Sequence, residues 1–157
     1  MVLNESPYGN RKDLLNEKIT GISAKKIPEF LEKKGKEIEA KVRARYEFTS
    51  DGEFQAICAE QDANGFIRAS YDGYGEFPIE VKYKGKEKLG FVPLHDWMQN
   101  QQQMAIACAP KILVLQSNDG VNVKEIWLEF NLDFWLKAEK ELINFWVKVE
   151  RGRGKLK

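Results

Sequence analysis

Two kinds of spacing between apolar residues divide the first half of the chain. Residues 11–19 have the spacing of a short helix. Pro28 suits the first turn of a second helix, and Gly35 could divide that helix in two. The apolar residues that follow Pro28 recur at helical spacing: Phe30, Leu31, Ile38, Val42 and Tyr46. The chain is therefore expected to begin with helices.

The spacing then changes to the alternation of short strands. Residues 54–59, 66–71 and 78–83 are rich in apolar, aromatic and β-branched side chains. They are separated by residues 61–65 and 73–76, which contain the Gly, Asn and Asp typical of turns. This pattern predicts an antiparallel meander of three strands.

Helices and strands alternate in the second half. A helix is expected over 95–109, strands over 112–116 and 123–130, and a final helix capped by Asp133. The helix expected over 95–109 has Met98, Ala105 and Cys108 on its apolar side. The final helix offers a broad apolar face of Phe134, Leu136, Leu142, Ile143, Phe145 and Trp146. The order predicts an α/β (α+β) fold with a mixed central sheet flanked by helices.

Composition places the chain among globular proteins. With 157 residues, 43% of them hydrophobic, it is expected to form a single domain over residues 1–157. The sequence has no apolar run approaching the ~20 residues of a membrane helix. Its start lacks a signal-peptide pattern, and Cys58 and Cys108 lack a metal-binding or disulfide spacing, so a cytoplasmic location is expected.

Charge is nearly balanced, at +1 overall, but it is unevenly distributed. Lys and Arg concentrate at 25–45, at 82–88 and at 148–157, and the last of these is expected to be a flexible basic tail. Basic patches that flank a metal-binding acidic centre are typical of nucleic-acid enzymes. A mixed, solvated surface is the alternative, and charge alone favours it.

The residues best suited to chemistry lie at 72–82. Strand alternation over 77–83 puts Glu80 and Lys82 on one face, opposite Ile79 and Val81. A tight turn would return Asp72, expected at the end of the preceding strand, beside Glu80. Mg²⁺ prefers oxygen ligands and takes one or two carboxylates together with phosphate oxygens. Two carboxylates and a lysine therefore suit metal-dependent phosphodiester hydrolysis.

The Glu-x-Lys pattern alone is not specific. It also occurs at residues 32–34 and 39–41, both in stretches expected to be helical. An exposed strand with a salt bridge between Glu80 and Lys82 is the alternative.

Five segments, in order, resemble the PD-(D/E)xK nuclease superfamily, and within it the phage-type exonucleases related to lambda exonuclease and YqaJ. Residues 35–50 are similar to a helix that carries an acidic residue, Glu39. Ala69-Ser70-Tyr71-Asp72-Gly73 is similar to the Ser-Pro-Asp-Gly turn of the family, with Tyr71 in place of proline. The remaining segments are 7–18, Glu80-Val81-Lys82 and the glutamine-rich stretch 95–105.

This resemblance implies a restriction-endonuclease-like core and a role for each matching residue. Asp72, Glu80 and the Val81 carbonyl would bind Mg²⁺ or Mn²⁺, two ions in all, and Glu39 would approach the second ion. Lys82 would position or activate the attacking water. Gln99 would support the site or contact the DNA backbone. Residues expected to contact DNA are Gln103, Arg45, Arg11 and Lys84.

The resemblance further implies an exonuclease on double-stranded DNA ends in phage-type recombination, in a bacterial or phage-infected cell. It implies a ring-shaped trimer and a single-strand annealing protein as partner. The family's early Ser/Arg segment, which receives the 5′-phosphate, has no clear match, and Arg11 or Arg45 could replace it. A non-catalytic DNA-binding protein and a structure-specific endonuclease remain alternatives.

Overall fold

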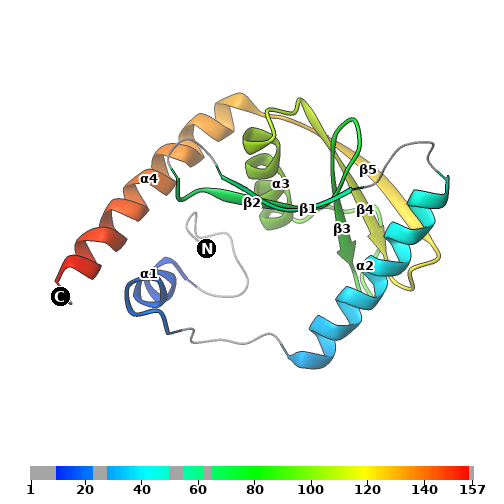
Figure 1. Cartoon of the computed structure of the whole chain (residues 1–157), viewed down its shortest axis with the longest axis horizontal. Helices are drawn as coiled ribbons and strands as arrows, with labels where there is room; N and C mark the ends of the chain where they lie inside the picture. Colours follow the sequence, from blue (N-terminus) through cyan, green and yellow to red (C-terminus); the bar gives the residue numbers. More distant parts are fainter. Residues whose placement is uncertain (1–9, 23–27, 50–54, 62–64, 156–157) are drawn as a thin grey trace. The chain divides into compact units, whose positions relative to one another are not determined.

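The structure is a computed structural model that describes residues 10–22, 28–49, 55–61 and 65–155 (Figure 1). Its elements, in chain order, are α1 (Arg11–Thr20), α2 (Glu29–Thr49), β1 (Gln55–Gln61), β2 (Arg68–Tyr74), β3 (Pro78–Tyr83), α3 (Leu94–Ile106), β4 (Lys111–Ser117), β5 (Val123–Glu129) and α4 (Leu132–Gly154). The order of helices and strands is the one expected from the sequence. Phe54, where the first strand was predicted to begin, lies outside the described residues.

The strands form one five-stranded mixed sheet in the order β1-β2-β3-β4-β5. β1, β2 and β3 pair antiparallel, which confirms the predicted meander, and β4 and β5 are also antiparallel. β3 and β4 pair parallel, with Glu80 opposite Val114. Parallel neighbours need a crossover connection, and α3 supplies it. The predicted fold class, a mixed sheet flanked by helices, is confirmed.

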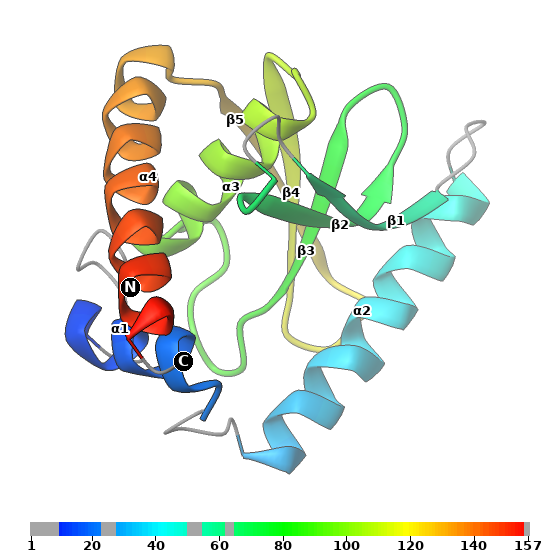
Figure 2. The same cartoon turned by 60° about the vertical axis from the view of Figure 1, so that its left-hand side comes forward.

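Helices α2 and α3 cover opposite faces of this sheet (Figure 2). One core joins Ile38 and Val42 of α2 to alternate residues of β3 and β4, including Ile79 and Val81. The other core joins Met104 of α3 to Ile112 and Val114. The alternation predicted for β3 is confirmed, because Ile79 and Val81 pack towards α2 while Glu80 and Lys82 point towards α3.

Two element boundaries differ from the sequence prediction. α2 is one uninterrupted helix, and Gly35 does not divide it. β2 extends to Tyr74, so Asp72 lies within the strand and not at its end. Pairing explains this shift, since Gly73 and Tyr74 are the β2 residues that pair with β3. The turn is correspondingly displaced to residues 75–77.

The predicted apolar side of α3 is wrong. Met98 and Ala105 are only half-buried, and Cys108 lies beyond the helix and is exposed. The buried residues of α3 are mostly polar: Asp96, Asn100, Gln101, Gln103 and Met104. Two of the buried amides bond to the backbone of the sheet: Gln101 donates to the Glu129 carbonyl and Gln103 to the Ser70 carbonyl. The half-buried Gln102 donates to the Arg68 carbonyl.

Although a single domain was expected, the chain divides into two compact units. One contains the sheet with α2 and α3, residues 27–130, and the other contains α1 and α4, residues 1–26 and 131–157. In the second unit Leu14 packs with Phe145 and Val149. Other parts of the predicted apolar face of α4 are exposed, including Leu136 and Ile143.

The predicted cap and tail of α4 both need correction. Asn131, not Asp133, caps the helix by accepting the Phe134 N–H, and Asp133 lies in the first turn. The predicted flexible tail is helical as far as Gly154, because it packs on α1. Arg153 donates to the Lys18 carbonyl at 3.0 Å, and a side chain at Gly152 would overlap Ile19. Among the described residues, no helix is long and apolar enough to span a membrane.

Candidate active site

The candidate site lies where β2 and β3 separate. The two strands pair at Gly73 with Ile79 and at Tyr74 with Pro78. Beyond these pairs, the N–H of Val81, two residues after Ile79, donates to Oδ2 of Asp72, one residue before Gly73, at 2.7 Å, so a side chain replaces the strand partner. N–H and C=O of one strand residue point to the same edge, so the Val81 carbonyl also faces the side of Asp72.

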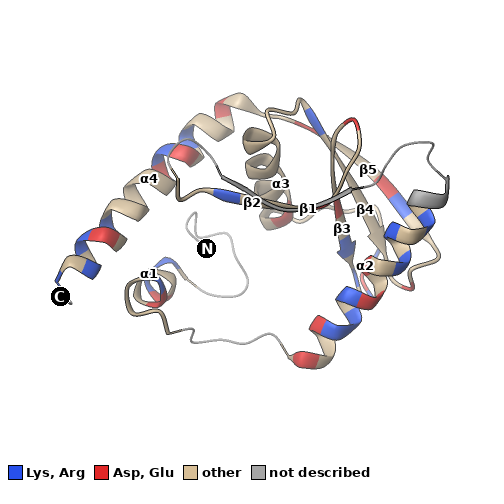
Figure 3. Cartoon of the chain, in the orientation of Figure 1, with Lys and Arg blue, Asp and Glu red and all other residues tan. Residues whose placement is uncertain are grey.

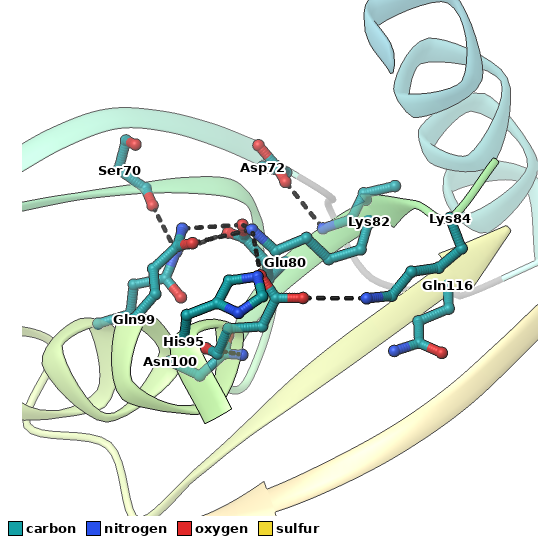
Figure 4. A network of polar contacts seen from close by, with 12 residues as sticks. Ser70, Asp72, Glu80, Lys82, Lys84, His95, Gln99, Asn100 and Gln116 are labelled. Carbon is teal, nitrogen blue, oxygen red and sulfur yellow. Dashed lines mark hydrogen bonds and ion pairs between the residues drawn. The ribbon is translucent and has the colours of Figure 1, made fainter. Parts of the chain in front are cut away.

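Glu80 lies beside this opening and is held from several directions (Figure 4). Its Oε1 accepts from Gln99 Nε2 at 3.0 Å and lies 2.7 Å from Lys82 Nζ. Its Oε2 accepts from Gln103 Nε2 at 2.6 Å. The residue is only 5% exposed, so these donors offset the cost of burying its charge. Glu80 therefore has a fixed orientation.

The two glutamines that hold Glu80 come from one face of α3. Gln99 and Gln103 are four residues apart and therefore lie one helical turn from each other. Gln99 also accepts from Lys82 Nζ at 2.8 Å, so it joins both ends of the Glu-x-Lys motif. Gln99 thus contacts both charged residues of the motif, and its predicted role as a support of the site stays a prediction.

Gln103 has a different position from the one predicted. The residue is 2% exposed and donates to Glu80 and to the Ser70 carbonyl. Gln103 is therefore not on a surface that could contact DNA. Sequence reasoning missed its contact with Glu80. The signal was present, because Asp96, Gln99 and Gln103 are spaced as one polar face of a helix.

The charges in the site perturb one another. Burial, and then the charge of Glu80, raise the pKa of Asp72 to about 7, although the Val81 N–H opposes the shift. Burial lowers the pKa of Lys82, but Glu80, Asp96 and Asp72 outweigh it, so the pKa is raised overall. Lys82 is therefore an ammonium group, suited to donating hydrogen bonds.

Glu39 lies on α2, the helix that packs on the other face of the sheet. Its charge is a minor contributor to the raised pKa of Asp72. Its carboxylate lies 3.6 Å from Arg43, one turn along the helix. The structure therefore brings together Asp72, Glu80, Lys82 and Gln99, and the approach of Glu39 to a metal stays a prediction.

A divalent cation would suit this neighbourhood. Within the described part of the chain, no three His, Cys, Asp or Glu side chains are grouped to hold a metal by themselves. Mg²⁺ does not require that, because it keeps several waters and typically takes one or two carboxylates. Burial and the nearby charge of Glu80 both raise the pKa of Asp72, and a bound cation would favour its ionised form. Asp72, Glu80 and the Val81 carbonyl are a fitting donor set.

The other residues expected to contact DNA are in varied positions. Lys84 is buried and bonds to Asp96, so it is not presented to a phosphate, contrary to the prediction. Arg45 is exposed on α2 and donates to the Val121 carbonyl. Arg11 belongs to the other compact unit, where it pairs with Glu141 at 3.0 Å.

The basic residues of α2 do not form a separate patch. Figure 3 shows Lys and Arg interleaved with acidic residues along this helix. Lys36 pairs with Glu32, and Lys41 pairs with Glu37, at the four-residue spacing of helix ion pairs. The alternative of a mixed, solvated surface therefore describes α2 better than a phosphate-binding patch does.

Comparison with known proteins supports the same fold. No family model matches the sequence. The crystal structure of an alkaline exonuclease, LHK-Exo, from Laribacter hongkongensis has a TM-score of 0.73 and 20% sequence identity, covering 99% of this chain and 88% of that one. A structure of LHK-Exo in complex with dAMP has a TM-score of 0.75 and 21% identity, covering 93% and 80%.

One curated relative is also similar in sequence. Mitochondrial escape protein 2 of Aspergillus niger is 22% identical over 120 residues, which cover 75% of this chain but 14% of that protein. The chain thus spans a small part of that relative, while it spans most of LHK-Exo. The comparison confirms the resemblance at the level of the fold: this chain has the fold of the alkaline exonuclease LHK-Exo.

Proposed function

We propose that this protein is a metal-dependent deoxyribonuclease that hydrolyses DNA from double-stranded ends. One observation carries the proposal: where β2 and β3 separate, Asp72 accepts from the N–H of Val81, the neighbour of Glu80, and Lys82 lies 2.7 Å from Glu80. The likeness of the fold to an alkaline exonuclease supports the choice of DNA as substrate. The dAMP in one LHK-Exo structure supports a site that accepts a deoxynucleoside monophosphate.

In this proposal some site residues bind the metal ion, and others orient the water, the phosphate or Glu80. Asp72, Glu80 and the Val81 carbonyl would hold Mg²⁺ or Mn²⁺, and Glu39 would approach a second ion. Bound there, the metal supplies a Lewis acid for the phosphoryl oxygen and lowers the pKa of water. The ammonium of Lys82 donates hydrogen bonds to the attacking water or to a phosphate oxygen. Gln99 and Gln103 keep Glu80 oriented.

The reaction is a hydrolysis. A water oxygen gives up a proton to solvent and forms a bond to phosphorus, the bond from phosphorus to the leaving sugar oxygen breaks, and that oxygen takes up a proton from solvent. Glu80 and Gln99 both bind the Lys82 ammonium, so it is positioned before the substrate arrives. Such positioning avoids a reorganisation cost during the reaction.

The wider role follows from the same resemblance. We place the enzyme in phage-type recombination, in the cytoplasm of a bacterial or phage-infected cell. A ring-shaped trimer and a single-strand annealing protein as partner complete the proposal. Sedimentation analysis with and without DNA would test the oligomeric state.

The deciding experiment compares end-labelled linear duplex with closed circular duplex, with and without Mg²⁺. The native protein is expected to degrade only the linear DNA, and only with metal. Lys82→Ala should remove this activity, while Lys86→Ala, a change at an exposed lysine of the next turn, should preserve it. Metal-independent cleavage, or equal cleavage by Lys82→Ala, would overturn the proposal. Equal degradation of circular DNA would identify an endonuclease instead.

A further inference from the structure

A second lysine lies behind the candidate site and is buried. The side chain of Lys84 is 6% exposed, and its ammonium donates to Asp96 Oδ2 at 3.0 Å. The other oxygen of Asp96 lies 3.7 Å from Lys82 Nζ. Charges therefore alternate from Glu80 through Lys82 and Asp96 to Lys84. Figure 4 labels Glu80, Lys82 and Lys84 in this network.

Backbone structure holds both members of this pair in place. Lys84 follows β3, and its N–H donates to the Ser117 carbonyl, which keeps it beside β4. Asp96 lies in the first turn of α3, where its carbonyl accepts from Asn100 Nδ2 at 2.8 Å. Two further titratable groups lie near the pair: the Glu87 carboxylate is 3.8 Å from Lys84, and the His95 ring is 3.5 Å from Asp96.

Lys82 therefore has two carboxylates within reach, at unequal distances. It lies 2.7 Å from Glu80 and 3.7 Å from Asp96, and both carboxylates are largely buried. Attraction between buried opposite charges is strong, and an unpaired buried charge is costly. Asp96 would compete for Lys82 if it had no closer cation. Lys84 is that closer cation.

We propose that Lys84 is a positioning residue: by binding Asp96, it keeps the Lys82 ammonium on Glu80 and Gln99. This inference rests on the proposed nuclease function, because Lys82 is the group whose position matters. Lys84 itself touches neither DNA nor metal in this account. Its contribution is to satisfy the carboxylate that would otherwise draw Lys82 away from the reaction.

A purely structural ion pair would behave differently. Its loss would lower stability, but the folded protein would retain its turnover rate. A positioning role lowers kcat in the folded protein and leaves KM for DNA nearly unchanged, since the buried Lys84 contributes no DNA contact. It further predicts that removing the charge of Asp96 compensates for the loss of Lys84.

The test uses the full chain with four changes: Lys84→Met, Lys84→Arg, Lys84→Met combined with Asp96→Asn, and Lys86→Met as the exposed control. Lys84→Met is expected to lower kcat by about 10- to 100-fold, the usual effect of losing an outer partner of a site. Lys84→Arg should retain more activity than Lys84→Met. The double variant should recover much of the loss, and the control should match the native protein.

A spectroscopic measurement tests the position of Lys82 without measuring turnover. The NMR signal of the Lys82 ammonium, assigned by its loss in Lys82→Arg, should shift in metal-free Lys84→Met and return towards its native position in the double variant. Circular dichroism and melting curves would establish that each variant is folded. If Lys84→Met does not fold, the comparison of Lys84→Arg with the native protein carries the same test.

The outcomes separate the two hypotheses. If the native protein does not cleave DNA with Mg²⁺, the proposed function fails, whatever the NMR signal shows. If the native protein cleaves DNA and folded Lys84→Met has native kcat and an unshifted Lys82 signal, the positioning role of Lys84 is overturned. A double variant with less activity than Lys84→Met would also contradict it.

Discussion

The carboxylate of Asp72 accepts the backbone N–H of Val81 at 2.7 Å, just beyond the last paired residues of β2 and β3. A side chain thus occupies the place of a strand partner at the opening between the two strands. This substitution satisfies a buried N–H and at the same time brings a second carboxylate close to Glu80. The resulting concentration of negative charge has measurable consequences.

The first prediction concerns stability without metal. Asp72 has a folded-state pKa of about 7, above the ~3.9 of an unfolded Asp, so the folded protein binds this proton more tightly. Its stabilising effect is full below the unfolded pKa and is lost as pH rises through about 7. Urea unfolding in EDTA should therefore show stability falling between pH 4 and 8. Asp72→Asn should reduce this fall, and an identical pH profile for both proteins would contradict the assignment.

The second prediction concerns Gln103. Replacing it with Leu removes a donor to buried Glu80 and should lower kcat by about 10- to 100-fold. It should also lower the free energy of unfolding by roughly 1–3 kcal/mol, because Glu80 and the Ser70 carbonyl lose a partner. Gln102→Leu is the matched control, since Gln102 bonds to Arg68 and not to Glu80. Kinetics and urea unfolding of both variants provide the measurement, and equal effects would argue against a specific role.

The third prediction concerns the turn between β4 and β5. Gly120 has φ of +80°, and a Cβ there would lie 2.8 Å from Lys41 Cβ. Gly120→Ala should therefore destabilise the fold by about 1–3 kcal/mol. Cleavage by the folded fraction should remain native, since the turn is outside the site. Calorimetric melting would show the first effect, and a native melting temperature would show that the turn relaxes easily.

The fourth prediction concerns the end of α4. A Cβ on Gly152 would meet Ile19 Cδ1 at 2.3 Å, so Gly152→Val should disrupt the packing of α4 on α1. Amide exchange of residues 149–153 is expected to be slow in the native protein and faster in the variant. Fast exchange in both proteins would restore the original expectation of a flexible tail.

Sequence reasoning succeeded where local pattern and packing agree. The alternation in β3 predicted the orientation of Glu80 and Lys82, because Ile79 and Val81 pack in a core on the opposite face. It failed for α3, since an apolar face was sought where the helix buries amides against backbone and charge. Gln103 is buried because of Glu80 and Ser70, which lie more than 20 positions away in sequence.

The same limit applies to the lysines. Lys82 and Lys84 are two residues apart, so strand alternation alone would put both side chains on the same face. Lys82 nevertheless lies beside the candidate metal ligands, whereas Lys84 is bonded to Asp96. Nothing local to 82–84 distinguishes them, because the distinction comes from α3. The position of Asp72 within β2 was likewise decided by pairing with β3 and not by its own segment.

Helix α3 connects β3 to β4 and also provides Gln99 and Gln103 to the site. The number of residues in this helix therefore determines the direction in which the two glutamine side chains point. Inserting one residue before Gln99 would rotate the glutamines by about 100° relative to the start of the helix, whereas four residues would nearly restore their direction. We expect this helix to tolerate substitutions at exposed positions but to resist changes of length.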